Sequence, residues 1–355
     1  MVSVADRVTE ELHIIACAGS PRQRGEAHGE ALRPQIAEGI ARWADVIAAV
    51  HGVAPDQYIA EFVQGTDYLP AIQRWTPALL AEAEGIARGS DQPWDWIYAC
   101  NLLDEEWTWA STRRLTAPGC TAIGCADPGG VPLLAQTMDI NAFHDGAQAV
   151  IRVEDDAGPD VMMLTRAGMI GLTGCNAAGL AVVVNNLDVL PSSPTGLPVA
   201  FAIRGVLERR SLADAVQFLG EVSHATGQHF GLASPEGLAS VEAWATGVAV
   251  APDPGARVFH TNHPLRTEPV ADDAESRFRR TRTRERLTYI ERAADGCATS
   301  ADLQELLTDR TVPVSLAASS PSMTFGAVVY ECSAPPVMHV ALGPPHQTPF
   351  RQVDW

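Results

Sequence analysis

The chain has 355 residues, of which 46% are hydrophobic and 19% charged, so it can bury a substantial core. Its formal net charge of −18 argues against partners that need a basic footprint, namely nucleic acid and anionic membrane surfaces. The sequence contains no lysine, which excludes a pyridoxal Schiff base, a phosphate-binding P-loop and a kinase site. Any general base must therefore be a histidine, a carboxylate or the chain's own amine.

Residues 1 to about 110 are expected to be mostly helical. After a short strand, LHIIACAG, apolar residues recur at helical spacing between Gly25 and Val50. Prolines then separate further helices near 57–64, 77–88 and 94–103. The N-terminus lacks a basic start and an apolar run, and no apolar run is long enough to span a bilayer. We therefore expect a cytoplasmic protein.

From Thr116 the sequence changes to short β-segments separated by turns. These segments are CTAIGCA, VPLLAQTMDI, QAVIRVE, VMMLTRA, MIGLTGCN and GLAVVVNNL. Helices follow over 199–219, where Ser211 caps the second of two, and more strands come next. A strongly basic helix is predicted over 275–294 and another, capped by Ser300, over 300–307, before two closing strands. This order is typical of sheets covered by helices.

Cys120 lies in the run APGCTAI, at the junction between the helical third and the β-rich part. One interpretation is a buried strand cysteine, the usual fate of a free thiol. The other is a nucleophile. Cleavage of the Gly119–Cys120 bond would give Cys120 a free α-amine, whose pKa of about 8 suits it to accept the thiol proton. The seven cysteines are scattered and lack CxxC spacing, so neither a disulfide framework nor a zinc ribbon is expected.

Two further residues have the chemistry to act with Cys120. Asp139 interrupts a strand-like run, where a charge needs a partner unless it lies on an edge strand facing water. A DPGG turn predicts a hairpin that brings Asp139 within one or two strands of Cys120. Asn262, in the block HTNH, is a neutral donor suited to an oxyanion hole. The two histidines of that block also suggest a metal site, but no third ligand is evident.

Asn176, Asn185 and Asn186 lie in or beside strands, where asparagine is disfavoured. Each alone is typical of a turn, and together with Cys120 they favour a polar pocket. The arginine-rich run 276–287 has the charge of an anion site. Its arginines spread around a helical wheel, however, which favours a solvated and ion-paired helix.

Several ordered blocks resemble the autoproteolytic cysteine acyltransferases and hydrolases of the N-terminal-nucleophile (Ntn) superfamily, the peptidase C45 family typified by isopenicillin N (6-aminopenicillanic acid) acyltransferase. They are RGEAHGEAL, APGCTAI, AQTMDI, TRAGMIGLTGCNAAGLAVVVNNL, PTGLPVAFAIRGVLE and FHTNHPL. The resemblance implies an α+β fold, a four-layer αββα sandwich with an N-terminal helical segment. It also implies a zymogen cut before Cys120 into a small chain, 1–119, and a catalytic chain, 120–355, which remain associated as a heterodimer.

The same resemblance implies roles for single residues. Cys120 is the expected nucleophile, Asp139 the partner of its amine or thiol, and Asn262 the oxyanion donor. Asn185 falls where relatives have an asparagine near the acyl oxygen. One stretch departs from the pattern, because the penicillin enzyme has an arginine within Ser-Arg-Gly-Ala-Thr where this chain reads SSPSMT, Ser319 to Thr324. That departure leaves open whether a penicillin-type substrate is used.

We therefore expect a self-processing cysteine amidase that cleaves an N-acyl amide through a thioester acyl-enzyme, without a metal or other cofactor. The alternative is an acyltransferase that moves an acyl group from a coenzyme A thioester or an amide to an amine. A second alternative, an inactive binding protein of the same fold, is disfavoured by the intact Gly119, Cys120, Asp139 and Asn262. The expected partner is a small N-acyl amide or acyl thioester, and assembly into a homo-oligomer is left open.

Overall fold

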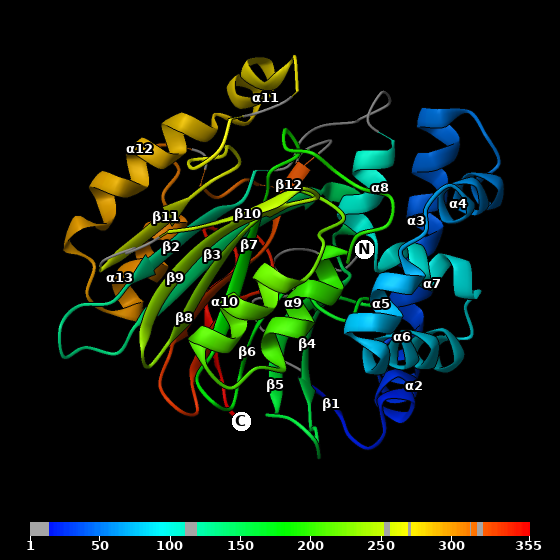
Figure 1. Ribbon diagram of the computed structural model, residues 1–355, viewed down its shortest axis with the longest axis horizontal. Helices are drawn as coiled ribbons and strands as arrows, with labels where there is room; N and C mark the ends of the chain where they lie inside the picture. Colours follow the sequence, from blue (N-terminus) through cyan, green and yellow to red (C-terminus); the bar gives the residue numbers. More distant parts are fainter. Residues whose placement is uncertain (1–13, 111–118, 252–255, 269–270, 313, 318–321) are drawn as a thin grey trace.

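Two stacked β-sheets covered by helices form the molecule (Figure 1). The computed structural model describes residues 14–110, 119–251, 256–268, 271–312, 314–317 and 322–355. Hydrophobic clusters fill three interfaces: between the first sheet and the helices beside it, between the two sheets, and between the second sheet and the C-terminal helices. The four-layer αββα sandwich expected from the sequence is confirmed.

The first sheet has eight strands, and its outermost strand comes from the beginning of the chain. In spatial order the strands are β1 (Ile14–Cys17), β4 (Gln148–Val153), β5 (Val161–Arg166), β6 (Thr173–Asn176), β7 (Ala181–Asn186), β8 (Gln228–Ser234), β9 (Gly237–Trp244) and β10 (Gly247–Val250). Neighbours are antiparallel except β1 and β4, which pair in parallel. Residues before the proposed cleavage site therefore complete a sheet formed by residues after it.

The second sheet has six antiparallel strands and carries Asp139. In spatial order they are β11 (Arg257–His260), β2 (Thr121–Cys125), β3 (Leu133–Asn141), β12 (Ser322–Glu331), β13 (Val337–Ala341) and β14 (Arg351–Val353). The predicted hairpin is confirmed, because β2 and β3 pair with Thr121 opposite Thr137. Since β3 lies between β2 and β12, Asp139 is on a central strand, which rules out an edge-strand residue facing water.

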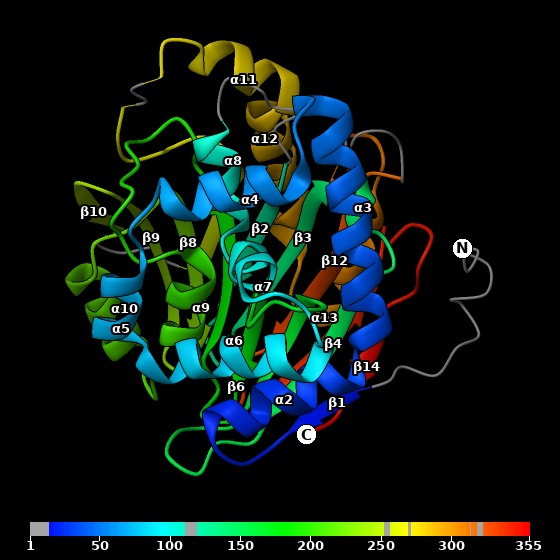
Figure 2. The same ribbon diagram turned by 90° about the vertical axis from the view of Figure 1, so that its right-hand side faces the viewer.

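The helices of residues 14–110 gather on one side of the sandwich (Figures 1 and 2). They are α2 (Pro21–Ala31), α3 (Arg33–His51), α4 (Pro55–Gln64), α5 (Leu69–Trp75), α6 (Pro77–Ser90), α7 (Trp94–Cys100) and α8 (Leu103–Trp109). Glycines let α2 and α6 pack closely, since a Cβ on Gly25 would lie 1.9 Å from the carbonyl oxygen of Glu82. The expectation of a mostly helical first third is confirmed, although the helix expected near 94–103 ends at Cys100.

The later helices cover both sheets. They are α9 (Val199–Leu207), α10 (Leu212–Glu221), α11 (Ala274–Thr281), α12 (Thr283–Ala293) and α13 (Ser300–Thr308), with short 3₁₀ turns at Ala142–His144 and Ala294–Gly296. Ser211 caps α10 as expected, but Thr299 caps α13, so the prediction of Ser300 is wrong by one residue. The basic helix expected over 275–294 is broken at Arg282, whose φ of 50° ends α11.

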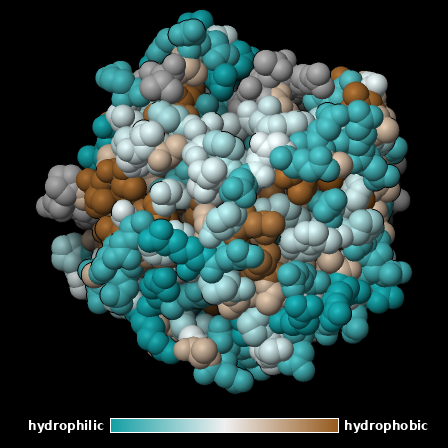
Figure 3. Space-filling view, turned by 45° about the vertical axis from the view of Figure 1, so that its right-hand side comes forward, coloured by the Kyte–Doolittle hydropathy of each residue, from teal (hydrophilic) through white to brown (hydrophobic). Residues whose placement is uncertain are grey.

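Hydrophilic and intermediate side chains make up most of the face shown in Figure 3, where hydrophobic side chains form separate patches. Within the described part of the chain, no helix combines the length and the apolar character needed to cross a bilayer. The expected cytoplasmic location remains a prediction.

Candidate functional site

Cys120 lies directly before β2, where it packs in a hydrophobic cluster with Met138 of β3. Its side chain is 9% exposed. Burial and the charge of Asp139 raise the pKa of the thiol to about 12, with a smaller rise from Asp104. The backbone N–H of Asp139 and the charge of Arg286 act in the opposite direction. The thiol is therefore protonated in the uncleaved chain and needs a base before it can attack a carbonyl.

Asp139 is buried in the middle of the six-stranded sheet. Thr324 lies opposite it on β12 and donates its hydroxyl to Oδ1 at 2.5 Å. Burial raises the pKa of Asp139 to about 7, although the Thr324 hydroxyl and the charge of Arg286 both oppose the rise. The carboxyl group next to Cys120 therefore changes protonation near neutral pH.

Arg286 of α12 links the expected site residues, and sequence reasoning missed it. Its Nη1 donates to the carbonyl oxygen of Cys120 at 2.6 Å and to Thr121 Oγ1 at 2.8 Å. Its Nη2 donates to Asn262 Oδ1 at 2.9 Å. A Cβ on Gly119 would lie 2.8 Å from Nη2, so the residue before the cysteine must be small for this guanidinium to fit.

The interpretation of 276–287 as a solvated helix is wrong for Arg286, which is 1% exposed. The cause is the break at Arg282, after which α12 turns one face towards the six-stranded sheet. That face carries Thr283, Arg286 and Ile290, all buried and at helical spacing. The sequence did contain a signal for this burial, because Arg286 precedes the apolar Ile290 by four residues and so lies on the same face of the helix.

The stretch that departs from the family pattern is described only from Ser322 onwards, and Ser319, Ser320 and Pro321 lie outside the described residues. Its last residue, Thr324, supplies the hydroxyl that binds Asp139. The guanidinium beside Cys120 comes instead from Arg286.

Asn262 follows β11 of the second sheet and makes a hydrogen bond to the end of β7 in the first sheet. Its backbone N–H donates to Thr283 Oγ1 at 2.7 Å, and its Nδ2 donates to the carbonyl oxygen of Asn186 at 3.1 Å. Through Arg286, Asn262 is also connected to Cys120. Arg286 therefore links the amide of Asn262 to the backbone carbonyl of Cys120, and this amide is held at both its oxygen and its nitrogen.

Asn185 is fully buried in β7, and its Oδ1 lies 2.9 Å from Nδ1 of His229. Its Nδ2 has no hydrogen-bond partner among the described residues. Gln136 of β3 donates to the carbonyl oxygen of Val184, which holds this part of β7 against the second sheet. Asn176 is not part of the site. Its amide instead holds local turns and helix ends, donating to Leu207 and Arg209 and accepting from Ala178 and Leu180.

Two acidic residues in the first turn of α8 also lie near the site and were not predicted. Asp104 accepts hydrogen bonds from Asn186 Nδ2 at 3.1 Å and Gln228 Nε2 at 2.5 Å. Glu105 is fully buried, and its pKa is raised to about 8, first by burial and then by the charge of Asp104. The signal in the sequence was three consecutive acids, 104–106, inside an otherwise apolar helical segment.

The two histidines of the HTNH block make ordinary hydrogen bonds. His260 contacts Glu242 Oε1 at 3.0 Å and the carbonyl oxygen of Thr261 at 2.7 Å. Nδ1 of His263 lies 3.0 Å from Thr283 Oγ1. In the described ranges, no group of three or more His, Cys, Asp or Glu side chains is placed to hold a metal ion. The absence of a cofactor remains a prediction.

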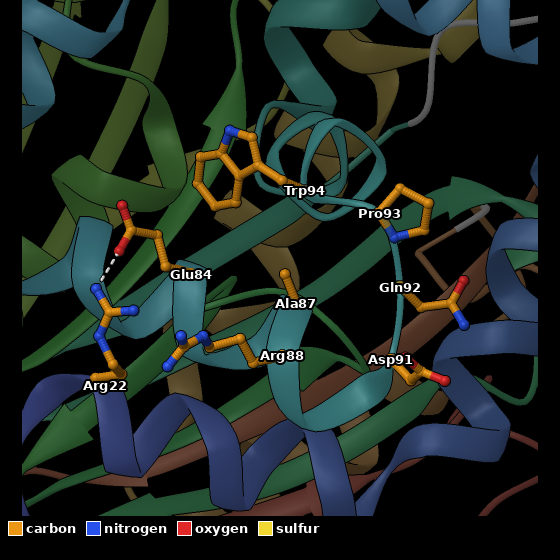
Figure 4. Close-up of a pocket in the computed structure, with 8 residues that line it drawn as sticks. All are labelled: Arg22, Glu84, Ala87, Arg88, Asp91, Gln92, Pro93 and Trp94. Atoms are coloured by element: carbon orange, nitrogen blue, oxygen red, sulfur yellow. Dashed lines mark hydrogen bonds and ion pairs between the residues drawn. The ribbon is translucent and has the colours of Figure 1, made fainter.

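A pocket of about 680 Å³ opens on the surface between α2, α6 and the start of α7 (Figure 4). Both signs of charge meet there, and Arg22 donates to Glu84 at 2.5 Å. It contains none of the expected site residues, being lined by Arg22, Glu84, Ala87, Arg88, Asp91, Gln92, Pro93 and Trp94.

The two helix-covered sheets, with a cysteine directly before a strand of the second, define the architecture of an Ntn hydrolase. The model of the family described as acyl-coenzyme A:6-aminopenicillanic acid acyl-transferase matches residues 125–346. A curated relative, the 40 kDa form of acyl-coenzyme A:6-aminopenicillanic-acid-acyltransferase from Emericella nidulans, is 30% identical over 270 residues, 72% of this chain and 70% of the relative. The chain belongs to this acyl-transferase family, which confirms the resemblance seen in the sequence.

Two solved structures are also similar. A variant of conjugated bile acid hydrolase from Clostridium perfringens has 13% identity and a TM-score of 0.46, over 66% of this chain and 92% of that chain. Penicillin V acylase from Agrobacterium tumefaciens has 15% identity and a TM-score of 0.39, over 63% and 84%. These likenesses are too weak to add to the family assignment. The segment matched by the family model contains Asp139, Asn185, Asn262 and Arg286, whereas Gly119 and Cys120 precede it.

Proposed function

We propose that this protein is a self-processing cysteine amidase. The observation that carries the proposal is the buried Gly119–Cys120 bond, enclosed by Arg286 and next to the carboxyl group of Asp139. A catalytic cysteine needs a base, and among the described residues no histidine charge acts on this thiol. The α-amine that cleavage would create on Cys120 itself fills that role.

Self-cleavage begins with attack of the Cys120 thiolate on the Gly119 carbonyl carbon. The acyl group moves from the backbone nitrogen to sulfur, and the freed nitrogen takes the proton that the thiol lost. Asp139 is the carboxylate whose charge acts most strongly on this thiol, and its pKa of about 7 suits it to relay the proton. Water then hydrolyses the thioester, which leaves a carboxylate on Gly119 and a thiol and an amine on Cys120.

Turnover uses the same sulfur on a separate substrate. The α-amine of Cys120, with a pKa of about 8, takes the thiol proton, and the thiolate attacks the acyl carbonyl carbon. The oxyanion accepts hydrogen bonds from the Nδ2 groups of Asn262 and Asn185. The amine departs with the proton, and water cleaves the thioester to release the acid. Arg286 contributes by holding Asn262 in place.

The two chains are expected to stay together after cleavage. Strand β1 of the small chain pairs with β4 of the large one, from Ile14 opposite Val150 to Cys17 opposite Val153. Side chains from both chains also share one hydrophobic cluster, in which Ile36 and Ile97 pack with Phe201 and Phe230. Separation would expose this cluster to water.

Acyl transfer is the second candidate, because the family and the curated relative are both named as acyltransferases. The two reactions share the thioester and differ in whether water or an amine attacks it. A panel of N-acyl-4-nitroanilides, incubated alone and with acceptor amines, separates them. Free acid without an acceptor indicates a hydrolase, and acylated amine indicates a transferase, which acyl-coenzyme A thioesters then test as donors. A cleaved protein inactive on every donor would support the inactive binding protein.

Denaturing electrophoresis and N-terminal sequencing test the self-cleavage. We expect chains 1–119 and 120–355 without added protease, and the larger one should begin Cys-Thr-Ala-Ile-Gly. Cys120→Ala should remain a single inactive chain. Cys125→Ala is the matched control, since Cys125 is also buried and lies at the other end of β2, and it should cleave normally. An active wild-type protein that stays in one piece would refute the mechanism.

A further inference from the structure

Two buried histidines, one from each sheet, stack on each other beside the asparagines of the site. His229 of β8 and His260 of β11 have ring centroids 3.7 Å apart, and their planes differ by 5°. Neither side chain is more than 1% exposed. Such close parallel contact between two ionisable rings constrains their protonation, because two imidazolium cations at this distance would repel each other.

Both ring nitrogens of His260 face oxygen atoms that can accept a hydrogen bond. Nδ1 lies 2.7 Å from the carbonyl oxygen of Thr261, which can only accept, and Nε2 lies 3.0 Å from Glu242 Oε1. Glu242 also accepts the backbone N–H groups of Leu265 and Arg266. Burial alone would raise the pKa of Glu242, but His260 and these N–H groups lower it below its usual value. Glu242 is therefore held as a carboxylate beside the His260 ring.

His229 is correspondingly neutral, since burial and the charge of His260 lower its pKa well below the usual value. Its Nδ1 lies 2.9 Å from Asn185 Oδ1, and its Nε2 lies 3.0 Å from Ser240 Oγ. The amide oxygen is an acceptor, so the single ring proton is on Nδ1, and Nε2 accepts from the Ser240 hydroxyl. This arrangement turns Nδ2 of Asn185 away from the ring, where it has no partner among the described residues.

We propose that His229 is a positioning residue, whose Nδ1–H holds the Asn185 amide so that its Nδ2 is presented to the acyl oxygen. Contact with His260 keeps His229 neutral, and the Asn185 oxygen and the Ser240 hydroxyl keep its ring proton on Nδ1. The His260–Glu242 pair fixes the turn 261–266, which carries Asn262. One buried hydrogen-bond network would thus orient both proposed oxyanion donors, Asn185 of the eight-stranded sheet and Asn262 beside the six-stranded sheet. This inference rests on the proposed oxyanion role of Asn185.

Two conservative substitutions of His229 distinguish this role from a structural one. An asparagine amide occupies the place of Nδ1 and a glutamine amide that of Nε2, so only His229→Asn retains a donor to Asn185. With the N-acyl-4-nitroanilide that the cleaved wild type hydrolyses fastest, we expect His229→Gln to lower kcat roughly 10- to 100-fold, less than the loss of a whole donor, with KM nearly unchanged. His229→Asn should retain kcat within about threefold of the wild type.

His224→Gln is the matched control. His224 is also buried, and within the described part of the chain its Nε2 makes one hydrogen bond, with the carbonyl oxygen of Leu219 at 2.8 Å. A glutamine amide retains that contact, so kcat should stay within about twofold of the wild type. Equal kcat values for His229→Gln and His229→Asn would overturn the inference, because a merely structural role does not depend on which ring nitrogen is replaced.

A double-mutant cycle with Asn185→Ala completes the test. If His229 acts only through Asn185, His229→Gln lowers kcat in the wild-type background and has no further effect in Asn185→Ala. An equal loss in both backgrounds, or no loss in either, overturns the positioning role alone. Wild-type kcat in Asn185→Ala overturns the proposed oxyanion role as well. If His229→Gln does not fold, Ser240→Ala takes its place in the cycle. Removing the Ser240 hydroxyl leaves Nε2 of His229 without its donor, so the ring proton can move from Nδ1 to Nε2.

Discussion

The guanidinium of Arg286 donates to Oδ1 of Asn262 across 2.9 Å, so an arginine of α12 sets the orientation of the amide after β11. A guanidinium has only donors, and the amide oxygen must therefore face it. Nδ2 is then directed at the carbonyl oxygen of Asn186, 3.1 Å away. One N–H of Nδ2 donates to that carbonyl oxygen, and the second is the group proposed to donate to the oxyanion.

Asn262→Ala should keep the fold and lose about 10²–10³ in kcat, the usual effect of removing one oxyanion donor. KM should change little, because the oxyanion exists only in the transition state. Asn262→Asp sharpens the test, since it retains an oxygen for Arg286, lacks the N–H donors and adds a negative charge that would repel an oxyanion. Asn262→Asp should therefore be at least as slow as Asn262→Ala in steady-state assays, whereas wild-type kcat in either would contradict the assignment.

A chelator tests the metal interpretation of His260 and His263 on the same wild-type enzyme. We expect turnover to be the same with and without it, because both histidines make hydrogen bonds within the protein. Activity that a chelator abolishes and added metal restores would reopen that interpretation.

Arg286→Lys should slow self-cleavage. Lysine retains the charge but cannot reach Cys120, Thr121 and Asn262 together from one planar group. Loss of one charge-assisted hydrogen bond, worth about 1.5–3 kcal/mol, corresponds to roughly 10- to 150-fold in rate. Gly119→Ala should also slow cleavage, since its Cβ would lie 2.8 Å from Nη2. The rate is measured by following the uncleaved chain on denaturing gels after synthesis.

Arg284→Lys is the control for this experiment. Arg284 lies on the same helix, but it is exposed and pairs with Glu275 at 2.6 Å. Its substitution should leave the cleavage rate unchanged. If Arg286→Lys cleaved as fast as Arg284→Lys, the guanidinium would have no part in the reaction.

The sequence allowed prediction of the parts of the site that depend on local pairing. Cys120 and Asp139 flank a short hairpin, so turn chemistry and strand alternation were sufficient to bring them together. Arg286 lies 166 residues from Cys120, and its place depends on how α12 packs against β2. A helical wheel that treats the basic run as one continuous helix does not show that Arg286 is buried. The chain breaks at Arg282, so the residues after it face a different direction from the one that the wheel gives them. Asp104 likewise reaches the site through contacts with Asn186 and Gln228, which lie 82 and 124 residues away in the sequence.

Thr324→Val should shift the pH profile of the enzyme. The pKa of Asp139 is about 7, raised by burial and lowered by the Thr324 hydroxyl. Removing a donor to the carboxylate disfavours its charged form, so the pKa rises further. If activity needs the carboxylate, the acidic limb of kcat/KM against pH moves to higher pH in Thr324→Val.

Asp139→Asn completes this comparison, because an amide does not titrate. We expect impaired cleavage or turnover in this variant. Any residual activity should lack the acidic limb of the kcat/KM profile that the titration of Asp139 produces. Superimposable profiles for the wild type and Thr324→Val, or full cleavage and turnover in Asp139→Asn, would show that the carboxylate has no role.

Glu105→Gln should stabilise the protein at alkaline pH. Glutamine retains an oxygen for the Val199 N–H and the Thr226 hydroxyl, and it replaces the second carboxylate oxygen, which has no partner among the described residues. The pKa of Glu105 is raised from 4.5 to about 8, so the folded state holds its proton more tightly than the unfolded state. Below pH ~4.5 the carboxyl group is neutral in both states and has no pH-dependent cost. As pH rises from about 4.5 to about 8, the wild type loses stability relative to Glu105→Gln, by up to a few kcal/mol.

The measurement is urea unfolding of both proteins at a series of pH values, in the Cys120→Ala background so that each is a single uncleaved chain. Glu331→Gln provides a control of opposite sign. The pKa of Glu331 is lowered, since its hydrogen bonds with Ser300 and His339 outweigh burial. Its carboxylate therefore stabilises the fold above the unfolded pKa, and this stabilisation is lost as pH falls. Glu331→Gln should accordingly be less stable than the parent at neutral pH, whereas Glu105→Gln should be more stable. If Glu105→Gln and the parent have parallel stability curves from pH ~5 to ~9, Glu105 titrates as an ordinary carboxylate and does not have the raised pKa.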